Sequence, residues 1–290
     1  MSTELAVRGL TKQFKKLRAV DHVSFTLRAG TITALVGETG CGKSTVARIL
    51  ARLHEPTSGE IVYEGKNILD GCDLRLYRSR VQMIFQDPFD SLNPVRTIRH
   101  HVERPLRIHR VVPKSEVTER VHELLRTVGL VPPERYAAKY PHELSGGQRQ
   151  RVAIARALAV EPAVILADEP ISMLDVSIRI GILNLMLDLR AQRNIAFLYI
   201  THDIASARYL ADEVLVMYGG QIVEQGPTDS VLLDPMHAYT RLLLSAVPHP
   251  ETGPRRQQLA GRAGRDVGEI GERTELVEAR PGHFVRREGQ

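Results

Sequence analysis

The feature that most constrains this chain is a glycine-rich stretch that begins at Gly37, ends at Ser44 and reads GETGCGKS. It fits the pattern G-x-x-x-x-G-K-[ST], in which glycines let a loop wrap so that backbone N–H groups point at phosphate oxygens. A strand-like run precedes the loop at residues 31–36 and a helical pattern follows at residues 46–53. The positive end of that helix would also face the phosphate. We therefore expect a phosphate site in which Lys43 lies between the β- and γ-phosphates of a nucleotide and the Ser44 hydroxyl binds Mg²⁺.

Two apolar runs farther along the chain end in polar residues. Residues 164–167 lead into Asp168 and Glu169, and residues 196–200 lead into Thr201 and His202. In open α/β sheets, ligands bind at the carboxyl edge of the strands. Two acids at the end of a strand would by themselves indicate only a solvated turn. Beside a phosphate loop they predict that Asp168 serves Mg²⁺, Glu169 polarises the attacking water and His202 contacts the γ-phosphate.

A weaker signal lies at Gln86, which follows the strand-like run of residues 81–85. An uncharged amide at this position could touch Mg²⁺ or the attacking water. It could also swing with the helical segment that follows it. We therefore include Gln86 in both the predicted catalytic set and the predicted metal set.

A second anion-binding pattern lies at residues 144–148, which read LSGGQ and precede a helical run. Ser145 and Gln148 match the capping box, and Gly146 and Gly147 leave the backbone open where the helix begins. An ordinary phosphate-loop enzyme needs only one phosphate-binding segment. We therefore expect a head-to-tail dimer in which Ser145, Gly146, Gly147 and Gln148 of each chain cover the nucleotide of the other, so that two nucleotides are sandwiched.

The distribution of apolar residues predicts an α/β protein. Helical patterns dominate from Asp87 to Ala159, where strand signals disappear. Strands alternating with helices on either side indicate a parallel sheet covered on both faces, with a helical segment inserted. After about residue 250 the chain is rich in Gly, Arg and Glu, which suggests a surface extension that is partly mobile. The strand-like runs are residues 5–7, 23–27, 31–36, 61–63, 81–85, 164–167, 196–200, 213–218 and 221–224.

Composition excludes several other classes of protein. No apolar run approaches the roughly 18 residues that cross a bilayer, and the first ten residues lack a secretory pattern, so we expect a cytoplasmic chain. The two cysteines, Cys41 and Cys72, are too few for a disulfide scaffold or a four-cysteine metal site. The net charge of +5 is mild, and the basic stretch at residues 96–120 has no aromatic residues for stacking on bases. A solvated helical face fits that stretch better than a nucleic-acid site.

These motifs, in this order, resemble those of the ABC ATPase family over roughly residues 5–250. The resemblance implies a P-loop NTPase core with a mostly parallel sheet, an antiparallel β-subdomain and an inserted α-helical subdomain. It implies an ATPase domain at residues 1–250, with the helical insertion at about 87–160, and an extension at 251–290. It also implies that Gln86 is the Q-loop, Asp168 the Walker B acid, Glu169 the catalytic base, Asp175 part of the D-loop at the dimer interface, and His202 the switch histidine. Phe14 would stack on adenine, although a core Phe would give the same pattern. The Walker A residues that would hold ATP are Gly37, Glu38, Thr39, Gly40, Cys41, Gly42, Lys43, Ser44 and Thr45.

Within this family, three stretches resemble the ATPases of oligopeptide and dipeptide importers. These are residues 85–94, 140–158 and 235–248. Two departures are notable. No cysteine follows Cys72, so the iron–sulfur cluster that some relatives carry is not expected, and Met173 stands in the D-loop where Ala is usual. Relatives in this class also transport oligosaccharides or nickel. A soluble ABC protein of DNA repair or translation, a non-catalytic subunit and an exporter are weaker alternatives.

The resemblance implies a peripheral subunit on the cytoplasmic face of the inner membrane that uses ATP and Mg²⁺. Its partners would be a second ABC ATPase subunit, either another copy or a paralogue, and transmembrane permease subunits. An extracytoplasmic binding protein would act indirectly, and no nucleic acid would be involved. The helical insertion and residues 87–93 would carry motion to the permease. The permease and the binding protein, rather than this chain, would select the cargo.

Cys41 lies inside the phosphate loop, where a small filler residue is a simpler role than a redox centre. We expect a bulky thiol reagent on Cys41 to block nucleotide binding, because the added group would occupy the loop. Titration of the alkylated chain with ATP measures this. Unchanged ATP affinity after complete alkylation would contradict it.

Overall fold

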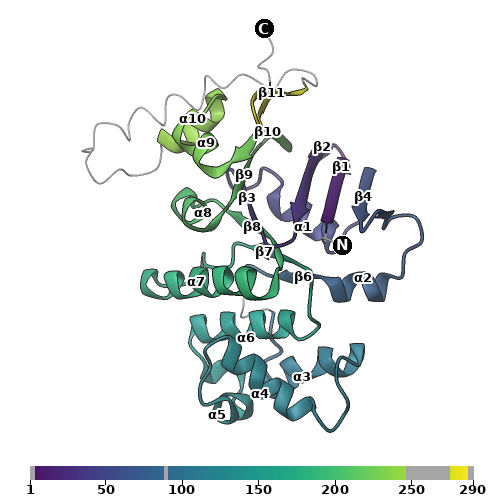
Figure 1. Ribbon diagram of the computed structural model, residues 1–290, viewed down its shortest axis with the longest axis vertical. Coiled ribbons are helices and arrows are strands. Elements are labelled where there is room, and N and C mark those ends of the chain that lie inside the picture. The colour runs from purple at the N-terminus through teal and green to yellow at the C-terminus, as the bar shows by residue number, and fades with distance from the viewer. Residues whose placement is uncertain (1–3, 88–90, 246–274, 287–290) are drawn as a thin grey trace.

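The computed structural model describes residues 4–87, 91–245 and 275–286. At its centre is a sheet of eight strands in the order β11-β12-β10-β9-β3-β8-β7-β6 (Figure 1). Parallel pairs join β6, β7, β8, β3 and β9, and antiparallel pairs add β10, β12 and β11. The strands of this sheet are β3 (Ile32–Val36), β6 (Val81–Ile84), β7 (Val164–Asp168), β8 (Ala196–Thr201), β9 (Glu213–Tyr218), β10 (Gln221–Pro227), β11 (Leu276–Arg280) and β12 (His283–Arg286).

The central strands are apolar throughout because both faces of the sheet are covered. In β8, Phe197 and Tyr199 belong to one hydrophobic core, and Leu198 and Ile200 belong to another. Successive side chains of a strand point to opposite faces, so each strand contributes to both cores. The unbroken apolar runs that predicted these strands therefore reflect burial on two sides.

A second sheet of four antiparallel strands, in the order β2-β1-β4-β5, shares the second core with α1 and the central sheet. Leu5 and Leu27 of this sheet, Ile49 of α1 and Leu198 of β8 are members of that core, and all are fully buried. The phosphate loop therefore runs between two sheets that are packed together. The elements of this part are β1 (Glu4–Phe14), β2 (Leu17–Arg28), α1 (Lys43–Leu50), β4 (Ser58–Tyr63), β5 (Lys66–Asn67) and α2 (Leu74–Arg80).

Between β6 and β7 the chain forms helices that gather at one end of the molecule, beyond α7 (Figure 1). The predicted capping box is confirmed: the Ser145 hydroxyl accepts from the Gln148 N–H at 3.3 Å, and the Gln148 side chain accepts from the Ser145 N–H at 3.1 Å. These helices are α3 (Ile98–His109), α4 (Val117–Thr127), α5 (Pro133–Ala138), a 3₁₀ turn (Pro141–Glu143) and α6 (Gly146–Leu158). The remaining helices are α7 (Val176–Arg193), α8 (Ile204–Leu210), α9 (Thr228–Leu233) and α10 (Ala238–Ser245).

The fold class expected from the sequence is confirmed, including the mostly parallel sheet, the separate antiparallel sheet and the helical insertion. The apolar runs of the sequence do not predict strands near the C-terminus. There, β11 and β12 form a hairpin. Val285 of β12 pairs with Glu224 of β10, so the hairpin extends the central sheet. Of the extension expected at residues 251–290, the structure describes only residues 275–286, and the expected partial mobility stays a prediction.

Across the described ranges, no helix is both long enough and apolar enough to pass through a bilayer.

The two-sided core makes a specific prediction for stability. Leu198 is fully buried in the central strand β8, so Leu198→Ala should lower the free energy of unfolding by about 2–5 kcal/mol, since it leaves a cavity. Denaturant unfolding followed by circular dichroism measures this. Leu233→Ala is the matched control, because Leu233 is 59% exposed and should change stability by less than about 0.5 kcal/mol. Equal effects of the two substitutions would contradict the two-sided core.

Candidate functional site

The phosphate loop joins β3 to α1 and folds as the glycine pattern predicts. Gly37 has φ +154°, and a Cβ there would lie 2.2 Å from the carbonyl oxygen of Met217. Gly42 has φ +113°, and a Cβ there would lie 2.1 Å from the carbonyl oxygen of Ala19. Both positions need glycine for their backbone angle and for the close approach of a neighbouring backbone. The loop is therefore fixed by β9 on one side and by β2 on the other.

Lys43 and Ser44 lie at the start of α1. Lys43 is 4% exposed, and its ammonium donates to the carbonyl oxygens of Gly37 and Glu38, both at 2.8 Å. The Ser44 hydroxyl donates to Asp168 Oδ1 at 2.9 Å. Burial raises the pKa of Asp168, and the hydrogen bond from Ser44 opposes that rise. A hydroxyl and a carboxylate side by side are hard oxygen donors, so these two residues fit a Mg²⁺ site.

Glu169 lies at the point where β7 ends and contacts two of the other predicted residues. Its carboxylate accepts from Gln86 Nε2 at 3.2 Å, and its other oxygen lies 3.1 Å from His202 Nδ1. Its φ is +46°, which is uncommon for a residue other than glycine. Strained backbone of this kind persists where the surroundings hold it, and it is concentrated at functional sites. The side chain is directed into the group formed by Gln86 and His202.

One cavity of ≈ 620 Å³ gathers most of the predicted residues. Phe14 lines this cavity and is 40% exposed, so it is not a core Phe. Ser172 and Met173 of the predicted D-loop also reach it. From the predicted set, the cavity is lined by Phe14, Thr39, Gly40, Gly42, Lys43, Ser44, Thr45, Gln86, Glu169 and His202.

The second predicted anion-binding device does not line this cavity. Ser145, Gly146, Gly147 and Gln148 begin α6, and Asp175 precedes α7. A Cβ on Gly146 would meet Leu174 at 3.5 Å, whereas a Cβ on Gly147 would meet Ile178 at 2.4 Å. The residues that line the cavity and the residues at the starts of α6 and α7 therefore lie on different parts of the chain. A single chain does not bring these two groups together.

Sequence reasoning missed one contact with the phosphate loop. The Tyr239 hydroxyl, in α10, accepts from the backbone N–H of Glu38 at 3.1 Å. Tyr239 is 1% exposed, and its ring lies 4.2 Å from that of Tyr218 between centroids. The only signal for it in the sequence was its position within residues 235–248, which resemble the C-terminal stretch of peptide-importer ATPases.

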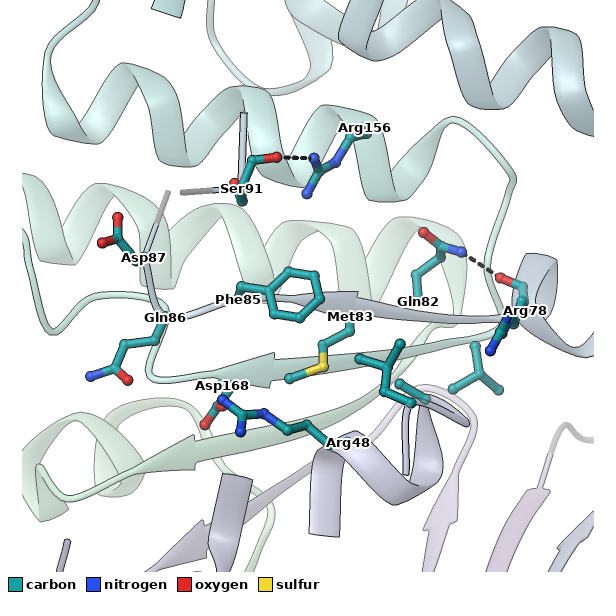
Figure 2. A pocket seen from close by; sticks show the side chains of 13 residues that line it. Arg48, Arg78, Gln82, Met83, Phe85, Gln86, Asp87, Ser91, Arg156 and Asp168 are labelled. Atoms are coloured by element: carbon teal, nitrogen blue, oxygen red, sulfur yellow. Dashed lines mark hydrogen bonds between the residues drawn. The ribbon is translucent and has the colours of Figure 1, made fainter. Parts of the chain in front are cut away.

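A second cavity, of ≈ 710 Å³, lies between β6, α1 and α2 (Figure 2). Figure 2 shows the Phe85 ring facing this space and Arg48 reaching toward Asp168. Arg156 of α6 donates to the Ser91 carbonyl at 2.5 Å on the far side of the cavity. Gln86 lines both cavities. Asp168 lines the second cavity and accepts from Ser44, which lines the first. The floor of the second cavity is therefore continuous with the predicted catalytic residues.

Comparisons with known proteins identify relatives of this chain. The family model described as "ABC transporter" matches residues 20–172, and the model described as "Oligopeptide/dipeptide transporter, C-terminal region" matches residues 223–273. The oligopeptide transport ATP-binding protein OppF of Bacillus subtilis (strain 168) is 45% identical over 93% of this chain and 90% of its own length. The glutathione import ATP-binding protein GsiA of Escherichia coli O6:H1 is 47% identical over 95% of this chain, which spans only 45% of that relative's length.

A solved structure gives the same result for the cassette. The dimeric post-hydrolysis state of the ATP-binding cassette MJ0796, bound to ADP and Pi, aligns with a TM-score of 0.69 at 31% identity. The alignment covers 77% of this chain and 98% of that one. The family assignment thus has independent support from sequence and from structure. The chain therefore belongs to the ABC transporter family and is an ABC-type ATPase subunit.

Proposed function

We propose that this protein is the ATP-hydrolysing subunit of an importer and powers the uptake of peptides through partner permease subunits. The observation that carries the proposal is the single cavity in which the phosphate loop, Glu169 and His202 meet. The C-terminal family match at residues 223–273 supports the peptide class, as does the likeness to OppF, an oligopeptide transport protein. Oligosaccharide or nickel import remains the alternative cargo class.

The proposed chemistry assigns one task to each residue. Phe14 stacks on the adenine ring, and the loop N–H groups with Lys43 bind the phosphates. Glu169 orients and polarises the attacking water, and His202 offsets charge that develops on the γ-phosphate. Gln86 donates to Glu169. Through this contact Gln86 transmits the occupancy of the nucleotide site to the segment that follows Gln86. When bound, Mg²⁺ at Ser44, Gln86 and Asp168 neutralises phosphate charge.

A complete site is proposed to need a second ATPase subunit, either another copy or a paralogue. Gly146 and Gly147 carry no side chains at the start of α6, while the N–H groups of Ser145 and Gln148 are bonded within the capping box. None of these four residues lines the cavity of its own chain. Paired head to tail, each subunit would place this device on its partner's nucleotide, with Asp175 near the contact. Hydrolysis would remove the phosphate that both halves bind, so the two subunits would separate.

The cavity of Figure 2 is the proposed contact with the permease. Its lining combines exposed apolar side chains, Leu53 and Phe85, with the cations Arg48 and Arg78. Such a lining suits an apolar helix end that carries an acidic residue. Because Gln86 lines both cavities, a permease segment seated there would sense the state of Glu169. Through this contact the subunit would sit on the cytoplasmic face of the membrane, and an extracytoplasmic binding protein would deliver cargo to the other side.

Replacing the proposed base tests the catalytic assignment. Glu169→Gln should lower ATP hydrolysis by at least about 100-fold, because a neutral amide cannot polarise water. It should also trap a dimer with ATP, which size-exclusion chromatography with light scattering would detect.

Glu60→Gln, at an exposed position of strand β4, is the matched control and should leave hydrolysis unchanged. In cells that lack the native subunit, wild type but not Glu169→Gln should restore the uptake of a labelled oligopeptide. Near-normal hydrolysis by Glu169→Gln would contradict the assignment, and restored nickel or oligosaccharide uptake in place of peptide uptake would correct the cargo class.

A substitution at Gly146 tests the shared pocket. Gly146→Asp should fold, because the space beside Gly146 admits a Cβ. It should lower hydrolysis more than about tenfold through repulsion of the partner's γ-phosphate, since ~1.4 kcal/mol is enough for that factor. ATP binding by the isolated chain, measured by calorimetry, should not change.

Gly146→Ala is the control for this experiment and should retain most of the hydrolysis, because it adds no charge. Loss of ATP binding by the isolated Gly146→Asp chain would argue that the two devices serve one pocket within a single subunit.

A further inference from the structure

The phosphate loop has a support outside the motifs that define it. Tyr239 lies in α10, some two hundred residues after the loop, and its buried hydroxyl accepts from the Glu38 N–H at 3.1 Å. Burial raises the pKa of Tyr239, so the phenol is neutral and can accept this bond at ordinary pH. Its ring packs on Tyr218, at the end of β9. The hydroxyl is therefore held in place by the ring behind it.

The contact falls at a point where it constrains the loop. Glu38 follows Gly37, whose φ of +154° sets the direction in which the loop leaves β3. The carbonyl oxygen of Glu38 accepts from Lys43, while its N–H is held by Tyr239. The Gly37 carbonyl, which shares a peptide group with the Glu38 N–H, also accepts from Lys43. If Lys43 turns to a phosphate, as the proposed function requires, the hydrogen bond from the Glu38 N–H to Tyr239 remains to hold this peptide group.

The start of α10 is in turn fixed by a buried carboxylate. Glu224 of β10 is fully buried, and its oxygens accept from the N–H groups of Met236 at 2.8 Å and His237 at 3.1 Å. His237 Nδ1 then accepts from the Tyr239 N–H at 3.1 Å. One carboxylate therefore sets the backbone directly before Tyr239. A buried charge of this kind is tolerated only when its hydrogen bonds are made.

The same carboxylate also binds the C-terminal hairpin. His283 of β12 is 1% exposed, and its Nε2 lies 2.7 Å from Glu224 Oε1. The side chain of Arg286, also in β12, donates to the Ile222 carbonyl at 3.1 Å. A continuous set of contacts therefore runs from the C-terminal hairpin through Glu224 and the start of α10 to the phosphate loop.

We propose that Tyr239 is a positioning residue of the phosphate loop, and that the C-terminal hairpin, through His283 and Glu224, holds Tyr239 in place and so sets the affinity for ATP. This inference rests on the proposed function, because it concerns the same nucleotide site. Tyr239 touches the loop and not the reacting atoms. Tyr239 fixes the conformation of the loop that binds the nucleotide, so it contributes to nucleotide binding more than to the chemical step.

The decisive variant is Tyr239→Phe in the full-length chain, which keeps the ring and removes the hydroxyl. The Kd and KM for ATP should rise about two- to tenfold, as expected for one lost hydrogen bond, while kcat stays within about twofold. Tyr218→Phe is the matched control, since it removes a hydroxyl from the same ring pair and leaves the bond to Glu38 in place. Unchanged Kd and KM in Tyr239→Phe, or a fall in kcat alone, would overturn the proposal.

A second pair of variants tests the role of the hairpin. His283→Ala removes the partner of Glu224 and should raise KM, whereas His283→Gln keeps a donor near the position of Nε2 and should restore much of the affinity. In the double variant with Tyr239→Phe, His283→Ala should add little, because both act through one hydroxyl. Fully additive effects would overturn the link between the hairpin and the loop.

Hydrogen exchange separates this proposal from the proposed function. Without nucleotide, exchange at the Glu38 amide should be faster in Tyr239→Phe than in wild type or Tyr218→Phe. Equal exchange would overturn the positioning role. If wild type failed to bind ATP, the proposed function would fall, and the exchange experiment would still decide whether Tyr239 holds the loop.

Discussion

The site depends on the parallel register of three neighbouring strands. Val36 of β3 pairs with Thr201 of β8, and Ile200 of β8 pairs with Asp168 of β7. The residues that follow each strand, Gly37, His202 and Glu169, therefore emerge side by side at the same edge. A shift of one residue would turn every side chain of a strand to the opposite face of the sheet. Burial on both faces fixes this register, so the packing of the core is also what aligns the catalytic groups.

That alignment costs stability where the polar residues begin. Asp168 is 3% exposed, and burial raises its pKa despite the hydrogen bond from Ser44, so its charged form is disfavoured. Glu169 adopts a left-handed backbone angle immediately afterwards. Neither feature stabilises the fold. Their neighbours, Ser44 and His202, offset part of the cost, and the proposed Mg²⁺ and nucleotide would offset more.

Sequence reasoning succeeded where a residue's role follows from its near neighbours. Apolar strands that end in acids, glycine turns and the Ser145 cap are local patterns, and the structure contains all of them. It failed for the C-terminal hairpin, because β12 is held by His283 and Arg286, buried polar residues that read as solvated in a charged segment. Glu224, the partner of His283, lies 59 positions earlier, and Ile222, whose carbonyl accepts from Arg286, lies 64 positions earlier, so no local pattern joins these pairs. The contact from Tyr239 to the loop was missed for the same reason.

Two adjacent glycines show how the helical part can act on the rest of the molecule. Gly147 has no room for a Cβ because Ile178 of α7 lies against it, so α6 and α7 approach closely there. Gly146 has room, and its neighbour Leu174 belongs to the segment that leads into Asp175. The start of α6 therefore packs directly on the D-loop and the start of α7. A rotation of the helical part that brought the LSGGQ segment toward a partner's nucleotide would move Asp175 with it. Two predicted interface elements would then reach the partner in one motion, since close packing transmits displacement between helices.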